Sequence, residues 1–346
     1  MTSAKFILSK KRLLEQVKSL EDLGLNLSYS YKTNREVGNV LQDVSDVDFS
    51  IHAREEIDMV RDKSKIWFFT QAELEEELME ILGKGIRNFV VDNEIDLQRI
   101  LTVIGQEGIK INLSLRMKFQ EHRIGSGKYF VYGMVSKRVN ELVSEIRANE
   151  FVGDLGIHVH RKSQNTSEWE ILGELKDSLS EDSLKKIDFL NLGGGLPIEY
   201  RGYTSKILPY IFEKISLAKK FLEEHDVKTY LEPGRFLAGP AIKLETKIIQ
   251  VQGKNLVINT TIYNCALDCF LTNTKLLIES ELSEGEGDSY LIKGNSPTRD
   301  DIFRYSVKLK DPQVGDKIIF LNAGAYNYTT DFFGYKKLNT EIVEDF

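Results

Sequence analysis

The feature that most constrains the fold is a repeated alternation of short β-branched runs with longer amphipathic helical stretches. The strand-like runs cover 25–31, 47–52, 65–69, 87–91, 109–116, 153–160, 187–192 and 228–232. Helical patterns such as 72–82 and 136–148 fill the gaps between them. Eight such units over roughly 220 residues match the size of an α/β fold of the (β/α)8 TIM-barrel type. An open doubly wound sheet is the alternative for the same alternation.

The pattern changes after Pro240. Strand-like runs at 242–251, 256–264, 289–293 and 317–321 are separated by turns, with little room for crossover helices. This change predicts a C-terminal antiparallel β domain, joined by the first residues of the chain. We therefore expect a barrel over 20–240 and a β domain over 241–346 together with 1–19.

Composition limits the classes of function. The net charge of −7 leaves no basic stripe to neutralise nucleic-acid phosphates, and no apolar run reaches the length of a membrane span. Two cysteines, Cys265 and Cys269, give neither a disulfide framework nor a four-thiolate metal site. The first ten residues are too poor in apolar side chains for a signal peptide. We expect a cytoplasmic protein that binds no nucleic acid and no membrane.

An acid and a base stand three residues apart directly after the last predicted barrel strand. Glu232 and Arg235 flank a Pro-Gly pair, which forces a turn and exposes backbone N–H groups. Such a turn can hold both ends of one ligand, with a carboxylate for a ring nitrogen and an arginine with amides for a phosphate. A surface ion pair on a turn is the alternative.

Other unusual residues follow other predicted strands, at the edge where TIM barrels carry their active sites. Lys32 follows the first strand, and burial there would lower its proton affinity and suit it to form a Schiff base. The glycines of 193–195 follow the seventh strand and let backbone amides approach an anion. His158 and His160 share one strand face. They are two candidate zinc ligands without a third, so stacking on a cofactor ring is the better interpretation.

At these positions the sequence resembles the fold-type III pyridoxal-phosphate decarboxylases, which act on ornithine, lysine, arginine or diaminopimelate. The similarity runs through nearly the whole chain and preserves the order of several motifs. The matching stretches are 29–34, 49–56, 156–164, 193–195, 232–235, 324–326 and 333–335. The resemblance implies an alanine racemase-like barrel and the cofactor pyridoxal 5′-phosphate.

The resemblance also implies roles for individual residues. Lys32 would hold the cofactor as a Schiff base, Glu232 would pair with its ring nitrogen, and His158 would stack on its ring. These three form the implied catalytic set. The implied cofactor-binding set is Lys32, His158, Ser163, Gly194, Gly195, Glu232, Gly234, Arg235 and Tyr326. Ser163 follows His158 after two more residues than the family motif has.

One motif departs from the family pattern. The family usually carries a Gly-Pro-Thr-Cys-Asp sequence, whose cysteine acts as an acid and whose aspartate reads the distal amine of the substrate. The corresponding stretch here, 294–301, contains no cysteine. Arg299 could receive a second carboxylate, and Asp300 or Asp301 could read an amine. A surface turn is the alternative for all three.

The resemblance implies a decarboxylase acting on a basic or diamino L-amino acid, ornithine, lysine or diaminopimelate among them. It further implies a homodimer whose active sites are shared between subunits. Because the cysteine is missing, two alternatives stay open. One is an enzyme of altered outcome, a racemase or a decarboxylation-linked transaminase, and the other is a non-catalytic regulatory homologue.

Overall fold

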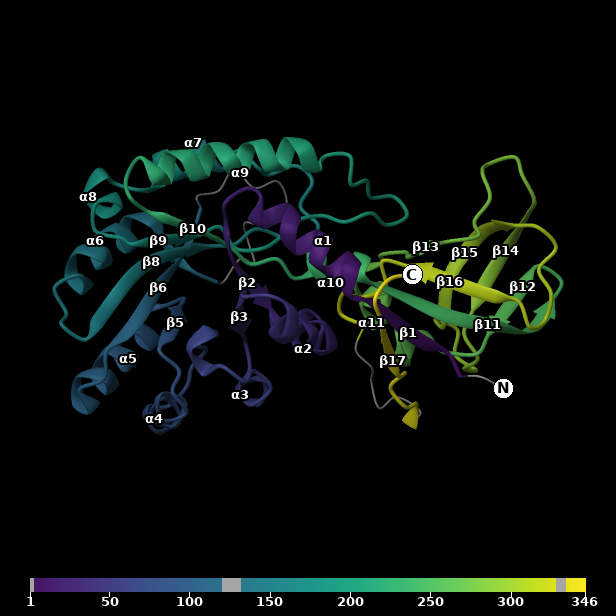
Figure 1. The fold of residues 1–346 in the computed structure, drawn as a ribbon, viewed down its shortest axis with the longest axis horizontal. Helices are drawn as coiled ribbons and strands as arrows, with labels where there is room; N and C mark the ends of the chain where they lie inside the picture. The colour runs from purple at the N-terminus through teal and green to yellow at the C-terminus, as the bar shows by residue number, and fades with distance from the viewer. Residues whose placement is uncertain (1–2, 120–131, 328–333) are drawn as a thin grey trace.

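Eight parallel strands close into a barrel in the computed structural model, which describes residues 3–119, 132–327 and 334–346 (Figure 1). The strands are β2 (Asn26–Ser30), β3 (Asp48–Ile51), β4 (Ile66–Phe69), β5 (Asn88–Val91), β6 (Ile111–Lys118), β8 (Val152–Val159), β9 (Phe189–Asn191) and β10 (Lys228–Leu231). Pairing of β10 with β2, and of β5 with β6, closes the ring. The short strand β7 (Met134–Val135) pairs with the end of β6. The predicted TIM barrel is confirmed, and the doubly wound sheet is wrong.

Helices follow the barrel strands and cover the outside of the ring (Figure 1). They are α2 (Arg35–Val44), α3 (Arg54–Ile57), α4 (Glu75–Gly83), α5 (Glu94–Glu107), α6 (Ser136–Ile146), α7 (Ile171–Ser178), α8 (Glu181–Leu184) and α9 (Leu208–Glu223). Helix α10 (Arg235–Ala241) follows β10 and lies between the barrel and the β domain (Figure 1). Helix α5 shows why they form. The Asn93 side chain caps its first turn, apolar residues such as Ile100 and Ile104 recur on its buried face, and Gly108 ends it at φ +63°.

Aromatic side chains fill the interior of the barrel. Trp67 meets Phe189 edge to face, with ring centroids 4.9 Å apart, and Tyr230 packs against both rings. Each large side chain buried in this way stabilises the fold by about 2–3 kcal/mol. Because the interior is filled, ligands can enter only at the ends of the strands.

The second domain is a curled sheet that combines the first strand of the chain with the last ones. Its strands are β1 (Lys5–Ser9), β11 (Ile242–Gln252), β12 (Asn255–Ile258), β13 (Leu277–Ile278), β14 (Asp288–Lys293), β15 (Ile302–Leu309), β16 (Lys317–Leu321) and β17 (Thr340–Val343). Most pairs are antiparallel, as expected, but β12 pairs with β14 and β1 with β17 in parallel. The predicted strand 256–264 ends at Ile258, because the chain turns there into the 3-10 helix Ile262–Asn264 and helix α11 (Leu267–Thr272).

The two domains meet at the C-terminal rim of the barrel. Helix α1 (Lys10–Glu21) runs from β1 to the barrel and packs on α10, which leads into β11 (Figure 1). The loop after β16 lies on the turn after β2, where the backbone N–H of Tyr326 donates to the Thr33 carbonyl at 2.8 Å. The Asn34 side chain donates to the Gly324 carbonyl at 2.8 Å. These bonds bring a β-domain segment to the barrel mouth. Within the described residues, no helix is long and apolar enough to cross a membrane.

Candidate active site

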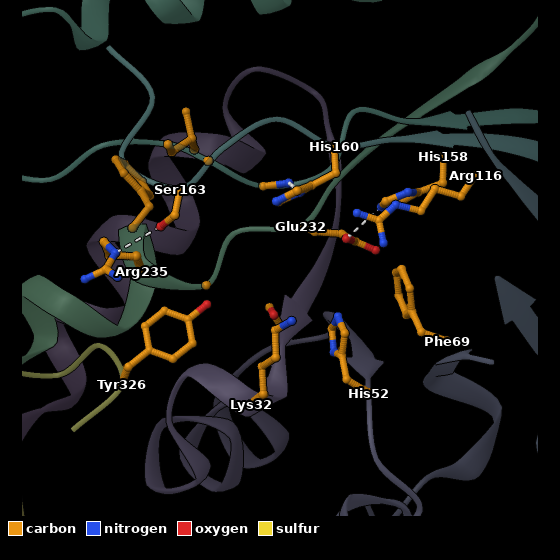
Figure 2. A pocket seen from close by; sticks show the side chains of 16 residues that line it. Lys32, His52, Phe69, Arg116, His158, His160, Ser163, Glu232, Arg235 and Tyr326 are labelled. Atoms are coloured by element: carbon orange, nitrogen blue, oxygen red, sulfur yellow. Dashed lines mark hydrogen bonds and ion pairs between the residues drawn. The ribbon is translucent and has the colours of Figure 1, made fainter. Parts of the chain in front are cut away.

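A pocket with about 680 Å³ of empty space lies at the C-terminal ends of the barrel strands. Figure 2 shows Lys32 between Tyr326 and His52, with Glu232 opposite. Side chains and loops from seven barrel strands and one β-domain loop converge here. The lining residues are Ser30, Lys32, His52, Phe69, Arg116, His158, His160, Ser163, Gly194, Gly195, Leu196, Glu232, Gly234, Arg235, Phe236 and Tyr326. Every residue of the predicted cofactor-binding set is therefore on this wall.

Glu232 is a buried carboxylate with three hydrogen-bond donors around it. Ser50 and the Asn191 amide each donate to its Oε1 at 2.9 Å, and His158 Nε2 lies 3.0 Å from its Oε2. Burial alone would raise its pKa, but these donors and the nearby His52 outweigh burial and lower the pKa of Glu232 to about 2. Glu232 is consequently ionised at neutral pH.

The two histidines of β8 and the loop after it have different environments. His158 is only 1% exposed, and its Nε2 bonds Glu232. His160 is partly open to the pocket, lies parallel to His158 at 6.4 Å, and accepts a hydrogen bond from the Gly194 N–H at 3.2 Å. The structure thus gives His158 a carboxylate partner and leaves the ring of His160 for a ligand. Counted from His160, Ser163 follows after two residues, which removes the extra residues noted in the sequence.

Lys32 extends into the pocket from the single 3-10 turn Tyr31–Thr33 after β2. The surrounding wall desolvates its amine and lowers the pKa of Lys32, while Glu232 works in the opposite direction and Arg116 adds to the lowering. Among the described side chains, no acceptor takes a hydrogen bond from the Lys32 amine. A lysine of this kind is more nucleophilic than a surface lysine.

Sequence reasoning missed several further wall residues, among them His52, Phe69 and Arg116. His52 lies flat on Phe69, with ring centroids 4.5 Å apart and an interplanar angle of 11°, and its buried Nδ1 has no hydrogen-bond partner. Burial, with Lys32 as the next cause, lowers the pKa of His52 to about 3. Arg116 of β6 stands opposite His158 in the strand register and lines the same wall. His52 follows β3, Phe69 ends β4 and Arg116 lies two residues before the end of β6. Their position at the ends of barrel strands was the available signal.

The glycine loop after β9 approaches its neighbours too closely to carry side chains. A Cβ on Gly194 would lie 2.7 Å from the Glu232 carbonyl oxygen, and one on Gly195 would lie 2.7 Å from the Lys162 carbonyl oxygen. Gly195 also has φ +104°, a conformation that side chains oppose. The loop therefore keeps its backbone at the pocket wall only as glycine.

Arg235 begins α10 and is already engaged by neutral and acidic partners. Its Nη1 donates to Asp268 at 2.8 Å and to the Tyr200 hydroxyl at 2.9 Å. Its Nη2 donates to the other Asp268 oxygen at 3.3 Å, and its Nε donates to Ser163 at 3.3 Å. The ring of Tyr326 lies 5.1 Å from the guanidinium carbon. The partner Asp268 comes from the β domain, and no local sequence pattern marks it.

The loop 294–301 lies between β14 and β15 of the β domain, away from the pocket of its own chain. Arg299 and Asp300 are exposed there. Asp301 is fully buried and accepts hydrogen bonds from the backbone N–H groups of Ile262 and Ser296 and from the Ser296 hydroxyl. Asp301 therefore stabilises the loop, because both of its carboxylate oxygens accept hydrogen bonds from loop groups. The expectation that Asp301 reads a substrate amine disagrees with that geometry.

Neither cysteine reaches the pocket. Cys265 and Cys269 are buried free thiols near α11. Burial raises the pKa of both, that of Cys269 to about 12. A proton donor for pocket chemistry within this chain must therefore be another group.

The wall fits pyridoxal 5′-phosphate in its donor set. At one end, Ser163, Gly195 and Tyr326 offer O–H and N–H groups suited to a phosphate, and the guanidinium of Arg235 lies beside them. At the other end, an ionised carboxylate suits a protonated ring nitrogen, and the amine of Lys32 lies between them (Figure 2). Among the described residues, no group of three acidic, histidine or cysteine side chains is arranged to hold a metal ion. The arrangement can therefore bind an aldehyde covalently beside fixed charges of both signs.

Comparison with known proteins agrees with this site. The family model described as the pyridoxal-binding domain of pyridoxal-dependent decarboxylases matches residues 10–239, well over half of the chain. Over 335 residues the chain is 28% identical to a diaminopimelate decarboxylase of Vibrio cholerae, covering 90% of this chain and 79% of that protein. A diaminopimelate decarboxylase of Aquifex aeolicus is 26% identical over 73% of this chain and 64% of its own length.

The fold comparison extends over the whole chain. The crystal structure of a diaminopimelate decarboxylase from Helicobacter pylori complexed with L-lysine superposes with a TM-score of 0.84 at 18% identity. The superposition covers 100% of this chain and 93% of that one. At that identity the match establishes the shared architecture of barrel and β domain.

Proposed function

The chain belongs to the family of pyridoxal-dependent decarboxylases, and we propose that it decarboxylates a basic or diamino L-amino acid with the cofactor attached to Lys32. When bound, the cofactor supplies an electron sink for the electron pair that the departing carboxylate leaves behind. Glu232 would hold a proton at the ring nitrogen. His160 would present its ring to the cofactor, and the phosphate would lie among Ser163, the glycine loop, Arg235 and Tyr326.

One observation carries the proposal: the buried Glu232 carboxylate and the Lys32 amine face the same pocket. The hydrogen bonds to Glu232 outweigh its burial and lower its pKa to about 2, and burial lowers the pKa of Lys32. A carboxylate that stays charged and an amine that loses its proton readily are the two conditions for keeping a pyridine ring protonated while an aldehyde is bound. A non-catalytic relative has no chemical need for both.

The cavity supports a substrate with charges at both ends. Beyond Phe69 and Arg116 the pocket continues into a second hollow with about 1150 Å³ of empty space. Its wall includes the acids Asp92 and Glu168 and the bases Arg161 and Lys162, of which Lys162 and Glu168 are paired at 3.2 Å. Space and both signs of charge suit a side chain that ends in an amine or an ammonium–carboxylate pair.

A substrate screen tests the proposal. Purified protein with pyridoxal 5′-phosphate would be given diaminopimelate, ornithine, lysine, arginine or a carboxylated polyamine, and released carbon dioxide and amine would be measured. We expect stoichiometric carbon dioxide and amine from at least one of them. Cofactor-dependent visible absorbance without carbon dioxide release from any substrate would contradict decarboxylation, and no absorbance at all would favour the regulatory homologue.

An enzyme of altered outcome is the second candidate. It is favoured by the burial of both cysteines and by Pro297 and Thr298 in the loop where the family cysteine would stand. Without that acid, a proton can arrive from another direction. Chiral analysis of the amino acid and assay for the aldehyde or ketone product distinguish racemisation and transamination from simple decarboxylation.

We further propose a cytoplasmic homodimer in which Arg299 and Asp300 act in the pocket of the partner subunit. Both are exposed and lie outside the pocket of their own chain. Mixing inactive Lys32→Ala subunits with inactive Asp300→Ala subunits tests this arrangement. Shared sites would restore about a quarter of wild-type activity, because random pairing makes half of the dimers hybrids with one intact site each. Sites contained within one subunit would give no recovery.

A further inference from the structure

We propose that Asp268, a residue of the β domain, sets how tightly the barrel holds an anion beside Arg235 by cancelling the charge of the guanidinium. The inference rests on the proposed function, because the anion is taken to be the cofactor phosphate. Asp268 would be a positioning residue that touches neither cofactor nor substrate. It would make the phosphate affinity of one domain depend on a side chain from the other.

The pair is built as a buried, two-pronged contact. The Asp268 oxygens lie 2.8 Å from Nη1 and 3.3 Å from Nη2 of Arg235. The side chains are 11% and 7% exposed. Asp268 lies in the first turn of α11, so the contact joins the barrel turn after β10 to the β domain. A bidentate pair of this kind fixes the guanidinium plane as well as its charge.

Most donors of Arg235 are used before any ligand binds. A guanidinium has five N–H groups. The hydrogen bonds to Asp268, Tyr200 and Ser163 occupy four of them. Arg235 therefore contributes little net charge and few free donors at this end of the pocket. The remaining donors around it are neutral, chiefly the Gly195 amide and the hydroxyl of Ser163.

The negative charge of Asp268 repels an anion in the pocket. In a partly buried site with an effective dielectric constant of about 20, a carboxylate within about 10 Å of an anion weakens the binding of that anion by tenfold or more. Removing the charge of Asp268 should consequently tighten phosphate binding. A merely structural pair predicts the opposite sign, because a loosened Arg235 would bind phosphate less well.

Asp268→Asn is the decisive variant, since it keeps the size of the side chain and one acceptor for Nη1. Full-length protein would be titrated with pyridoxal 5′-phosphate, with inorganic phosphate as competitor, and binding followed by tryptophan fluorescence. We expect inorganic phosphate to bind about tenfold tighter than to wild type. Pyridoxal, which lacks the phosphate, should bind with unchanged affinity.

Tyr200→Phe is the matched control. It removes a neutral hydrogen bond from the same Nη1 and leaves the charges alone, so its phosphate affinity should stay within about twofold of wild type. Unchanged or weaker phosphate binding by Asp268→Asn would overturn the inference. An equal change in Tyr200→Phe would do the same, because loosening of Arg235 would then explain both.

A charge-balanced pair keeps the test decisive if Asp268→Asn fails to fold. Arg235→Gln leaves Asp268 uncompensated and should bind phosphate at least tenfold more weakly, whereas Arg235→Gln with Asp268→Asn should recover to within about fivefold of wild type. Equal losses in both would contradict charge cancellation. Failure of the proposed function looks different, because wild-type protein would then bind no pyridoxal 5′-phosphate.

Discussion

Glu232 and His158 form a buried pair in which carboxylate Oε2 lies 3.0 Å from imidazole Nε2. With Ser50 and Asn191 on its other oxygen, Glu232 has filled three of about four acceptor directions. The remaining direction is available to a ligand in the pocket. The three protein donors hold the carboxylate in place and ionised, so its charge is present before a ligand arrives.

Replacing Glu232 by Gln should lower kcat by about 100-fold or more, because the ring nitrogen loses the fixed charge that keeps it protonated. Ser50→Ala removes one donor and should lower kcat much less, roughly tenfold, since two donors still hold the carboxylate. Steady-state kinetics on the best substrate of the screen measures both. Equal losses in the two variants would contradict a role for the charge itself.

Lys32→Ala should abolish the visible absorbance that wild-type protein gains with pyridoxal 5′-phosphate, and should lower kcat at least about 1000-fold. Borohydride treatment followed by mass analysis should find the reduced cofactor on Lys32 of wild-type protein. Lys84→Ala is a suitable control, because Lys84 forms a surface pair with Asp58. Retained absorbance in Lys32→Ala would place the attachment elsewhere.

Acid should destabilise the cofactor-free protein through its pocket histidines. Burial is the first cause that lowers the pKa of His52 and of His160 to about 3, while an unfolded histidine has a pKa near 6.5. The unfolded chain therefore binds more protons between these values, and stability present above pH 6.5 is lost as the pH falls. Asp48 has the opposite effect on stability. Burial raises its pKa to about 6, so the folded state binds a proton at Asp48 more readily than the unfolded state does.

A variant separates these effects. His52→Gln should reduce the loss of unfolding free energy between pH 7 and pH 5 by about 1–2 kcal/mol, measured by urea denaturation at each pH. An unchanged pH dependence in His52→Gln would show that His52 is protonated equally in the folded and unfolded chain.

Local patterns predicted the barrel well and the site only in part. Each barrel strand formed near its predicted position, because β-branched runs and turn residues act locally. The roles of His158 and His160 could not be assigned from spacing, since both point to one strand face and only packing shows that His158 meets Glu232. The contact of Asp268 with Arg235 could not be predicted for a related reason. Its partner Arg235 lies 33 positions away in another domain, and no local signal marks such a contact.

Asp300 and Asp301 are neighbours in the loop 294–301, but their replacement should affect the free energy of unfolding very differently. Asp301→Ala leaves the N–H groups of Ile262 and Ser296 without their acceptor, which should lower the free energy of unfolding by about 2–4 kcal/mol. Asp300→Ala should change stability by less than about 0.5 kcal/mol because the side chain is exposed. Chemical denaturation measures both. Because Asp300 is proposed to act in the pocket of the partner subunit, Asp300→Ala should lose activity while it keeps its stability.

Gly195→Ala tests the glycine loop. At φ +104°, with the Lys162 carbonyl oxygen 2.7 Å from the new Cβ, alanine forces the loop to shift. We expect the unfolding free energy to fall by about 1–3 kcal/mol and pyridoxal 5′-phosphate to bind at least tenfold more weakly. Gly83→Ala at the end of α4 meets nothing within 4 Å, so it should leave cofactor binding unchanged and stability equal or slightly higher. Full cofactor affinity in Gly195→Ala would mean that the loop backbone does not bind the phosphate.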